Sequence, residues 1–254
     1  MTPISATILT FNEERSIEQC LRSLEDVADE IIVVDACSTD RTAEICRQWP
    51  HCRVAVRPMN GYGAQRQYAT SLASYDYVLA IDADEALSPS LRNEIIRLKK
   101  QGLDHRGYSF SRLNFYCGIP VKHSGWYPDT QIRLFDRRYA NWNLNDVAEK
   151  VIFRDSVTPC PIDGDILHYR CNSPQEYEQT EMAHAALRAR LIAASGNRPG
   201  ALRPLWEGMK AFVDCYIGSR AILDGEAGRQ ISVRRFRSAR HAFNLARRMM
   251  DGKK

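Results

Sequence analysis

The sequence reads Asp76-Tyr77-Val78-Leu79-Ala80-Ile81-Asp82-Ala83-Asp84-Glu85 near the end of its first third. The first six residues are mostly apolar, β-branched or aromatic and include no glycine or proline, so they predict a buried strand. Asp82 and Asp84 follow it, at the place where open α/β sheets bind ligands. Buried carboxylates repel each other unless a cation or donor groups compensate them, and hard cations join carboxylate oxygens to phosphates. The stretch therefore predicts a metal–diphosphate site; the alternative is an acidic turn in which Glu85 opens a helix.

Strand and helix signals alternate around this stretch. Short apolar runs predict strands over residues 4–9, 30–35, 54–56 and 76–81. Cap residues and helical apolar spacing predict helices that begin near residue 12, near residues 38–42 and at residue 64. Such alternation is typical of βαβ units, so we expect an α/β fold with a mostly parallel central sheet.

The later part of the chain has a different pattern. Alternating residues predict strands over 108–113 and 131–135, with aromatic and glycine residues between them. We therefore expect a small antiparallel region that lines a cleft. Helical spacing then predicts helices over 175–195, 205–223 and 232–250.

Composition restricts the class of protein. The chain has 254 residues, 44% hydrophobic and 26% charged, which is ordinary for a globular enzyme. It has no apolar run of about 18 residues, as a membrane helix needs, and its N-terminus shows no secretory signal. Its eight cysteines are scattered without a Cys-x-x-Cys pair, which disfavours a zinc site or a disulfide framework. We therefore expect a cytoplasmic protein.

Positive charge is concentrated at the C-terminal end. Residues 229–254 carry nine Lys or Arg and one acid, a net charge of +8, whereas the whole chain is +4, so residues 1–228 carry −4. A basic amphipathic helix over 232–250 is typical of binding to the inner face of the cytoplasmic membrane. The alternative is that its apolar side packs on the domain while the arginines stay in water. A nucleic-acid-binding module would leave the carboxylates and the acidic first 228 residues unexplained, so we expect no nucleic-acid partner.

Four segments in order identify a family: Thr10–Glu14, Val34–Thr42, Asp82–Glu85 and Trp126–Phe135. They resemble the inverting family 2 glycosyltransferases, which have the GT-A fold. With the later Leu167-His168-Tyr169 and Leu223-Asp224-Gly225, the chain is similar to the bacterial branch that adds glucose or a similar hexose to the inner core of lipopolysaccharide. Other family 2 transferases, which build cell-wall or capsule glycans, are an alternative. A nucleotidyltransferase acting on a sugar phosphate is another, but the segment after the first strand is acidic where that class needs glycines and basic residues.

The resemblance implies a domain organisation. A Rossmann-like GT-A catalytic domain is expected over residues 1–172, with a nucleotide-sugar half at 1–105 and an acceptor half at 106–172. The antiparallel strands belong to the acceptor half. Residues 173–254 would form a helical C-terminal region with a basic amphipathic end.

The resemblance also implies which residues bind the UDP-sugar donor and which bind the metal. The residues expected to contact a UDP-sugar are Thr10, Asn12, Glu13, Asp35, Arg66, Asp82 and Arg133. Asp35 would accept from the uracil N3–H. Mg²⁺ or Mn²⁺ would be held by Asp84, Asp82 and His168 and would neutralise the departing UDP. The alternatives are helix caps for Asn12 and Asp35, an exposed surface position for Arg66 and a structural role for His168.

Inverting transfer needs one general base to remove the proton of the acceptor hydroxyl. Relatives place a His-Glu pair where this chain has Ala148-Glu149, so the glutamate is present and the histidine is not. We expect Glu149 to be the base, followed by Asp129 and then Asp146; the alternative for Glu149 is an ion pair with a lysine or arginine. Trp126 and Tyr127 would stack on the acceptor sugar, or Trp126 would belong to the core.

Overall fold

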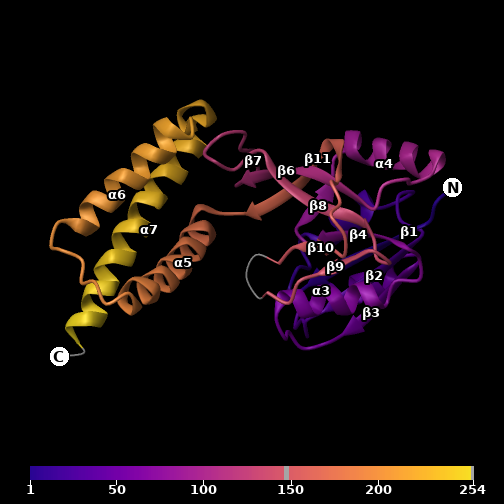
Figure 1. Cartoon of the computed structure of the whole chain (residues 1–254), viewed down its shortest axis with the longest axis horizontal. Coiled ribbons are helices and arrows are strands. Elements are labelled where there is room, and N and C mark those ends of the chain that lie inside the picture. Colours follow the sequence, from indigo (N-terminus) through magenta and orange to yellow (C-terminus); the bar gives the residue numbers. More distant parts are fainter. Residues whose placement is uncertain (146–148, 253–254) are drawn as a thin grey trace. The chain divides into compact units, whose positions relative to one another are not determined.

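A computed structural model describes residues 1–145 and 149–252, which form two compact units (Figure 1). The first comprises Met1–Arg112 and Asp129–His168. The second comprises Leu113–Pro128 and Tyr169–Lys254. The second unit therefore consists of two separate stretches of chain, and Leu113–Pro128 belongs to the range 106–172 of the predicted acceptor half.

The strands of the described residues are β1 (Ile4–Thr10), β2 (Glu30–Asp35), β3 (Cys52–Val56), β4 (Tyr77–Asp82), β5 (Glu85–Leu87), β6 (Gly107–Tyr116), β7 (Ile119–Pro120), β8 (Asp129–Asp136), β9 (Ala140–Trp142), β10 (Val151–Phe153) and β11 (Cys160–Cys171). The main sheet has the order β3-β2-β1-β4-β8-β6-β11-β5, with β7 beside β6, while β9 and β10 form a separate pair. Pairing is parallel from β3 to β4 and antiparallel from β4 to β8 and from β8 to β6. The predicted α/β class, with a mostly parallel part and a small antiparallel part, is confirmed.

The helices are α1 (Ile17–Ser23), α2 (Thr42–Gln48), α3 (Tyr62–Ser71), α4 (Pro89–Gln101), α5 (Pro174–Ala194), α6 (Arg203–Val213) and α7 (Gly225–Asp251). A π-helical turn η1 (Asp214–Gly218) and a 3₁₀ turn η2 (Ala221–Asp224) lie between α6 and α7. The predicted helix over 205–223 is therefore interrupted, and the last helix begins seven residues before the predicted residue 232.

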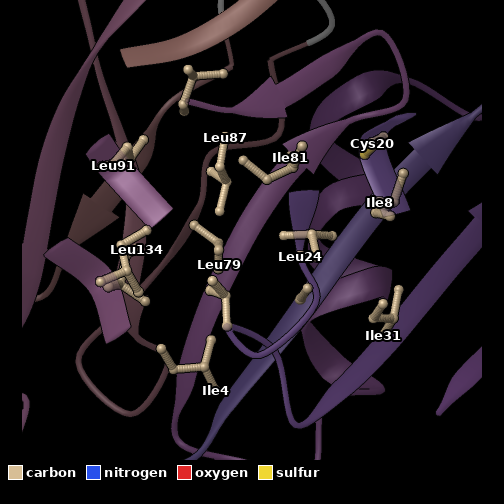
Figure 2. Packing of buried hydrophobic residues seen from close by; sticks show 14 of the residues in the cluster. Ile4, Ile8, Cys20, Leu24, Ile31, Leu79, Ile81, Leu87, Leu91 and Leu134 are labelled. Carbon is tan, nitrogen blue, oxygen red and sulfur yellow. The ribbon is translucent and has the colours of Figure 1, made fainter. Parts of the chain in front are cut away.

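The central strands are apolar on both faces because both faces are covered. In β4, Leu79 and Ile81 pack in one buried cluster with α1, α2 and α4, as Figure 2 shows for several of its members. Val78 and Ala80 point the other way, into a cluster with Trp142 and the end of α3. This alternation accounts for the unbroken apolar run that the sequence shows before Asp82.

Local signals explain where α4 begins and ends. Ser88 is its N-cap and accepts a hydrogen bond from the Leu91 amide, and Pro89 occupies the first turn. Gly102 ends the helix with a φ of 99°, which a glycine adopts without strain. Glu85 belongs to β5 instead, so the alternative in which it opens this helix is wrong.

The second unit is a helical bundle in which α7 packs along both α5 and α6 (Figure 1). The buried side of α7 consists mainly of small residues, including Ala239, Ala242 and Ala246. A separate apolar cluster joins Tyr116 and Trp126 to residues of α5, η1 and α7. Among the described residues, we find no helix that is both long and apolar enough to cross a bilayer.

Asp224 fixes the segment that precedes β8 in this second unit. Its buried carboxylate accepts hydrogen bonds from the backbone amides of Lys122 and His123 and from the Ser124 hydroxyl, at 2.7–3.1 Å. Nδ1 of His123 lies 3.0 Å from the same carboxylate. The Leu223-Asp224-Gly225 motif therefore ties the start of α7 to residues about a hundred positions earlier.

Candidate functional site

Strand register brings the predicted donor-site residues to one edge of the sheet. In the parallel pairing, Thr10 lies beside Asp35 and Leu9 lies beside Asp82. The carboxyl ends of β1, β2 and β4 therefore coincide, as expected for the ligand-binding edge of a parallel sheet. Three segments that lie far apart in the sequence thus converge at this edge.

A pocket of about 330 Å³ opens at this edge within the first unit. Seven of the predicted site residues line it, and the set is Thr10, Glu13, Arg66, Asp82, Asp84, Glu149 and His168. It also includes Phe11, Met59 and Tyr62, which are exposed apolar or aromatic residues. The lining therefore combines carboxylates, an imidazole, a guanidinium and flat apolar surface.

Arg66 holds two carboxylates of this pocket. Its Nη2 donates to both oxygens of Asp82 at 2.8 and 3.1 Å, and its Nε donates to Oε1 of Glu149 at 3.0 Å. The guanidinium also lies 4.6 Å from the ring centroid of Trp142. Arg66 is 5% exposed, so the alternative of an exposed surface arginine is wrong. Its partner Glu149 forms the ion pair that we had considered for it.

A glycine allows α3 to carry Arg66 into this position. A Cβ on Gly63 would lie 2.2 Å from the backbone oxygen of Asn143, so only glycine fits without a shift. Gly61, with a φ of 86°, precedes the first helical residue, Tyr62. The glycine turn thus brings α3 close to the segment after β9.

Arg133 compensates the buried acids behind the pocket. Its Nη2 lies 3.1 Å from Oδ2 of Asp82 and 3.2 Å from Oε1 of Glu85. Glu85 is 1% exposed, and its Oε1 also accepts a hydrogen bond from Nη1 of Arg112 at 3.2 Å. Burial alone would raise the pKa of Asp82, but the charges of Arg66 and Arg133 outweigh it and hold that pKa well below its usual range. Asp82 is therefore a fixed anion in the wall of the pocket.

Asp84 and His168 form the second polar element of the pocket. His168 lies opposite Glu85 in the antiparallel pairing of β11 with β5, which brings its Nε2 within 3.1 Å of Oδ2 of Asp84. A carboxylate oxygen and an imidazole nitrogen are both ligands for divalent cations. In the part of the chain that the structure describes, no group of three or more such ligands is present, so substrate phosphate oxygens would have to complete a metal site.

The charge balance of the site favours a cation. Besides Glu13, the pocket and the ion pairs next to it contain three guanidinium groups and five carboxylates, which leave a formal charge of −2 with His168 neutral. The carboxylates are Asp82, Asp84, Glu85, Asp129 and Glu149. A divalent cation would neutralise this excess, so the residues present fit a metal of the predicted kind.

Of the residues at the ends of β1 and β2, Thr10 lines the pocket, whereas Asn12 and Asp35 hold the neighbouring loops. The hydroxyl of Thr10 is buried at the pocket and has no hydrogen-bond partner among the described residues, so a ligand can satisfy it. Asn12 caps no helix; its Oδ1 accepts from the Thr39 amide at 2.8 Å, and α1 begins only at residue 17. Asp35 is buried, like Thr10, and its carboxylate accepts hydrogen bonds from the amide and the hydroxyl of Ser38. Asn12 and Asp35 thus shape the loops next to the pocket.

Four further predicted residues do not line the pocket. Asp129 is bound by Arg112 at 2.6–2.8 Å and by Gln131. In the second unit, Trp126 is 6% exposed and packs with its neighbours in the apolar cluster, while Tyr127 precedes a cis proline. Arg133 lies behind the pocket, as described above. Asp146, the third candidate base, and Ala148 lie outside the described residues.

Sequence reasoning did not single out Trp142, Tyr62, Phe11 or Met59. Trp142 packs against Arg66 from a short strand that the apolar pattern does not reveal. Tyr62 and Phe11 are 51% and 55% exposed, which is unusual for aromatic residues and is visible only in the structure. Their position at the pocket makes them available for stacking on a planar ligand.

Comparison with known proteins identifies the class of site. A family model described as glycosyl transferase family 2 matches residues 5–151, which include every pocket residue except His168. The chain belongs to glycosyl transferase family 2. It is therefore a glycosyltransferase, and the convergent strand ends form its candidate donor site.

Two relatives resemble this chain over most of its length. The lipopolysaccharide core biosynthesis glycosyltransferase LpsC of Rhizobium meliloti is 30% identical over 202 residues, which cover 78% of this chain and 74% of LpsC. An uncharacterized glycosyltransferase of Rickettsia typhi is 29% identical over 225 residues, which cover 84% of this chain and 77% of the relative.

A solved structure supports the GT-A fold. The mannosyltransferase PcManGT from Pyrobaculum calidifontis, solved with GDP-Man and Mn²⁺, matches 100% of this chain and 88% of its own with a TM-score of 0.51. The two sequences are 17% identical, so the similarity concerns the fold. The predicted GT-A fold of this family 2 glycosyltransferase is thereby confirmed.

Proposed function

We propose that this glycosyltransferase moves a hexose, with glucose as the first candidate, from a UDP-sugar to a lipopolysaccharide inner-core or related glycolipid acceptor. The observation that carries the proposal is the single pocket that joins the β1 edge, the Asp84–His168 pair and the Arg66-bound Glu149. Family membership supports the reaction, and the relation to LpsC supports the acceptor class. The proposed place of action is the cytoplasmic face of the bacterial inner membrane.

The donor would lie across the ends of the parallel strands. Thr10 would donate or accept through its unpartnered hydroxyl, and Glu13 would face the ribose. Asp35 and Asn12 would position the base through the loop that they hold, with Asp35 as the acceptor for uracil N3–H. Arg66 would stand beside the diphosphate, while Arg133 would keep Asp82 ionised from behind. Asp84 and His168, with Asp82 nearby, would hold Mg²⁺ or Mn²⁺, which would stabilise the negative charge on the departing UDP.

Glu149 is our proposed general base. Arg66 fixes one of its carboxylate oxygens at 3.0 Å, which leaves the other to face an acceptor hydroxyl. The acceptor oxygen would attack the anomeric carbon as its proton passes to Glu149. The bond between that carbon and the diphosphate oxygen breaks on the opposite face, so the configuration inverts. Asp129 is a weaker candidate because Arg112 and Gln131 already occupy its oxygens.

Donor binding tests the proposal directly. The melting temperature of the protein is measured with Mn²⁺ and a panel of nucleotide sugars. It should rise with UDP-glucose and stay unchanged with GDP-mannose. A ligand that binds only the folded state adds about 2.7 kcal/mol at a hundred times its dissociation constant. EDTA should remove the shift and stop UDP release. Stabilisation by GDP-mannose alone would contradict the UDP-sugar assignment, and no shift with any nucleotide sugar would contradict the donor site.

Replacing Glu149 with glutamine tests the base. We expect the rate of transfer to fall by about 10²–10⁴-fold, since the amide keeps the shape of the side chain but cannot accept the proton. Donor-induced stabilisation should persist. Glu94→Gln is a matched control, because Glu94 pairs with Arg97 on the surface of α4, away from the pocket. Full transfer by the Glu149→Gln variant would exclude Glu149 as the base.

A further inference from the structure

A row of apolar side chains lies on the surface of the second unit along α6. It consists of Leu202, Leu205, Trp206, Met209 and Val213, which we call the α6 row. Their exposed fractions range from 45% to 78%, although residues of these types usually lie inside. The spacing of three and four residues places all five on one side of the helix. The α6 row is therefore a continuous apolar stripe and not a set of scattered residues.

The opposite side of α6 is already used for packing. Pro204 and Gly208 are buried, and a Cβ on Gly208 would lie 3.0 Å from the ring of Phe236 in α7. This close approach fixes which side of the helix faces the bundle. The α6 row consequently points to solvent as a result of tight packing on the other side.

The apolar surface continues past the end of α6. Ile217 in η1 and Ile222 and Leu223 in η2 are 57–67% exposed. The π-helical turn, with its wider spacing, keeps Ile217 on the exposed surface while Cys215 is buried. The surface thus extends over about twenty residues of chain.

Positive charge accompanies this surface. Lys210 and Arg220 are exposed and form no ion pair with any residue that the structure describes, while Arg203 pairs with Glu207. Residues 113–128 and 169–254 hold 17 Lys or Arg and 8 Asp or Glu, a net charge of +9, whereas the rest of the chain is −5. An apolar stripe within a strongly basic unit is complementary to an anionic lipid surface.

We propose that α6 and the turns after it dock on an anionic bilayer, with the α6 row inserted among the lipid head groups. Trp206 suits this position, because tryptophan favours the boundary between water and hydrocarbon. A second copy of this chain is disfavoured as the occupant, since it would bring together two units that each carry a net charge of +9. The membrane contact therefore belongs to α6, whereas the sequence had suggested residues 232–250, whose small apolar residues are buried against α5 and α6. The inference rests on the proposed place of action at the membrane, but vesicle binding can be measured whether or not the enzyme transfers glucose.

Vesicle sedimentation with the full chain tests the proposal. The wild type should bind vesicles of 3:1 phosphatidylcholine and phosphatidylglycerol and bind pure phosphatidylcholine much less. The triple variant Leu202→Ser, Trp206→Ser and Met209→Ser should lose affinity on the order of 50-fold, because it removes three inserted apolar groups. The matched control is Val56→Ser, Ile119→Ser and Ile152→Ser, three residues of similar exposure outside α6, and it should bind like the wild type.

Tryptophan fluorescence locates the contact independently of affinity. Trp206 is the most exposed of the four tryptophans, so anionic vesicles should shift the emission to shorter wavelength, and Trp206→Phe should abolish the shift. Equal vesicle binding by the triple variant and the wild type would overturn the proposal. A stable dimer in light scattering that the triple variant abolishes, without vesicle binding, would assign the surface to a second copy and would also overturn it.

Discussion

Asp84→Asn should lower the rate of sugar transfer by about 10³-fold while the protein remains folded. Asp84 lies in the pocket with its Oδ2 3.1 Å from Nε2 of His168, and no guanidinium among the described residues pairs with it. An asparagine keeps the size of the side chain but removes the charge that would hold a divalent cation. Loss of a metal that stabilises the leaving diphosphate costs several kcal/mol of activation free energy, and each 1.36 kcal/mol is a tenfold change in rate.

The experiment measures UDP release at a series of Mn²⁺ concentrations with the donor that the binding panel selects. The Mn²⁺ concentration for half-maximal rate should rise at least about tenfold in the variant. Asp155→Asn is the matched control, because Asp155 is an exposed acid that pairs with Arg106 away from the pocket. An unchanged Mn²⁺ dependence with a folded Asp84→Asn protein would show that Asp84 does not hold the metal.

Arg133→Met should destabilise the protein by about 3 kcal/mol, because it removes the buried guanidinium that Asp82 and Glu85 share and leaves each with a single arginine partner. Arg133 is 4% exposed and lies between Asp82 and Glu85. Arg112 still reaches Glu85, which limits the loss. For a chain of this size the change corresponds to a melting temperature lower by about 10 °C.

Urea denaturation monitored by circular dichroism measures this loss. Arg22→Met is the control for removing a paired arginine, since Arg22 is 66% exposed and pairs with Glu18, which is 53% exposed, on the surface of α1. Exposed pairs contribute about 1 kcal/mol or less, so the control should stay close to the wild type. Equal losses in the two variants would show that burial does not set the contribution of Arg133.

Much of the first unit could be predicted because its signals are local. The apolar runs at 4–9, 30–35 and 76–81 predict buried strands, and acids directly after them predict a ligand-binding edge. The structure has strands at these places with their carboxyl ends side by side. Family motifs then linked the strand ends to a donor site.

The ion pairs of the site could not be predicted because their partners lie far apart in the sequence. Arg66 meets Glu149 from 83 positions away, and Arg133 meets Asp82 from 51. From the sequence, Arg66 fits a solvated helix face as well as a buried site. Only the packing of α3 against the segment after β9 decides between them.

In the C-terminal helices, the sequence pattern does not indicate which side of each helix is buried. The spacing predicts an apolar side of the last helix made of Val233, Phe236, Phe243, Ala246 and Met250. Of these only Ala246 is buried, and Ala239 and Ala242 are buried beside it. Alanine carries a weak pattern signal, since it suits both helix surfaces and close helix packing. The pattern predicts a helix over 205–223 but does not indicate that the apolar row of α6 faces solvent.

The contacts of Asp224 have a consequence for how this protein can be divided. The second unit consists of Leu113–Pro128, which runs from the end of β6 to the start of β8 and is called the insertion, and a C-terminal tail; the carboxylate of Asp224 joins the two. The insertion supplies Tyr116 and Trp126 to a core whose other half is the tail. A chain ended at residue 172 would therefore keep half of a hydrophobic core in water. The helical region is not a detachable module, and a hybrid enzyme would have to exchange both pieces together.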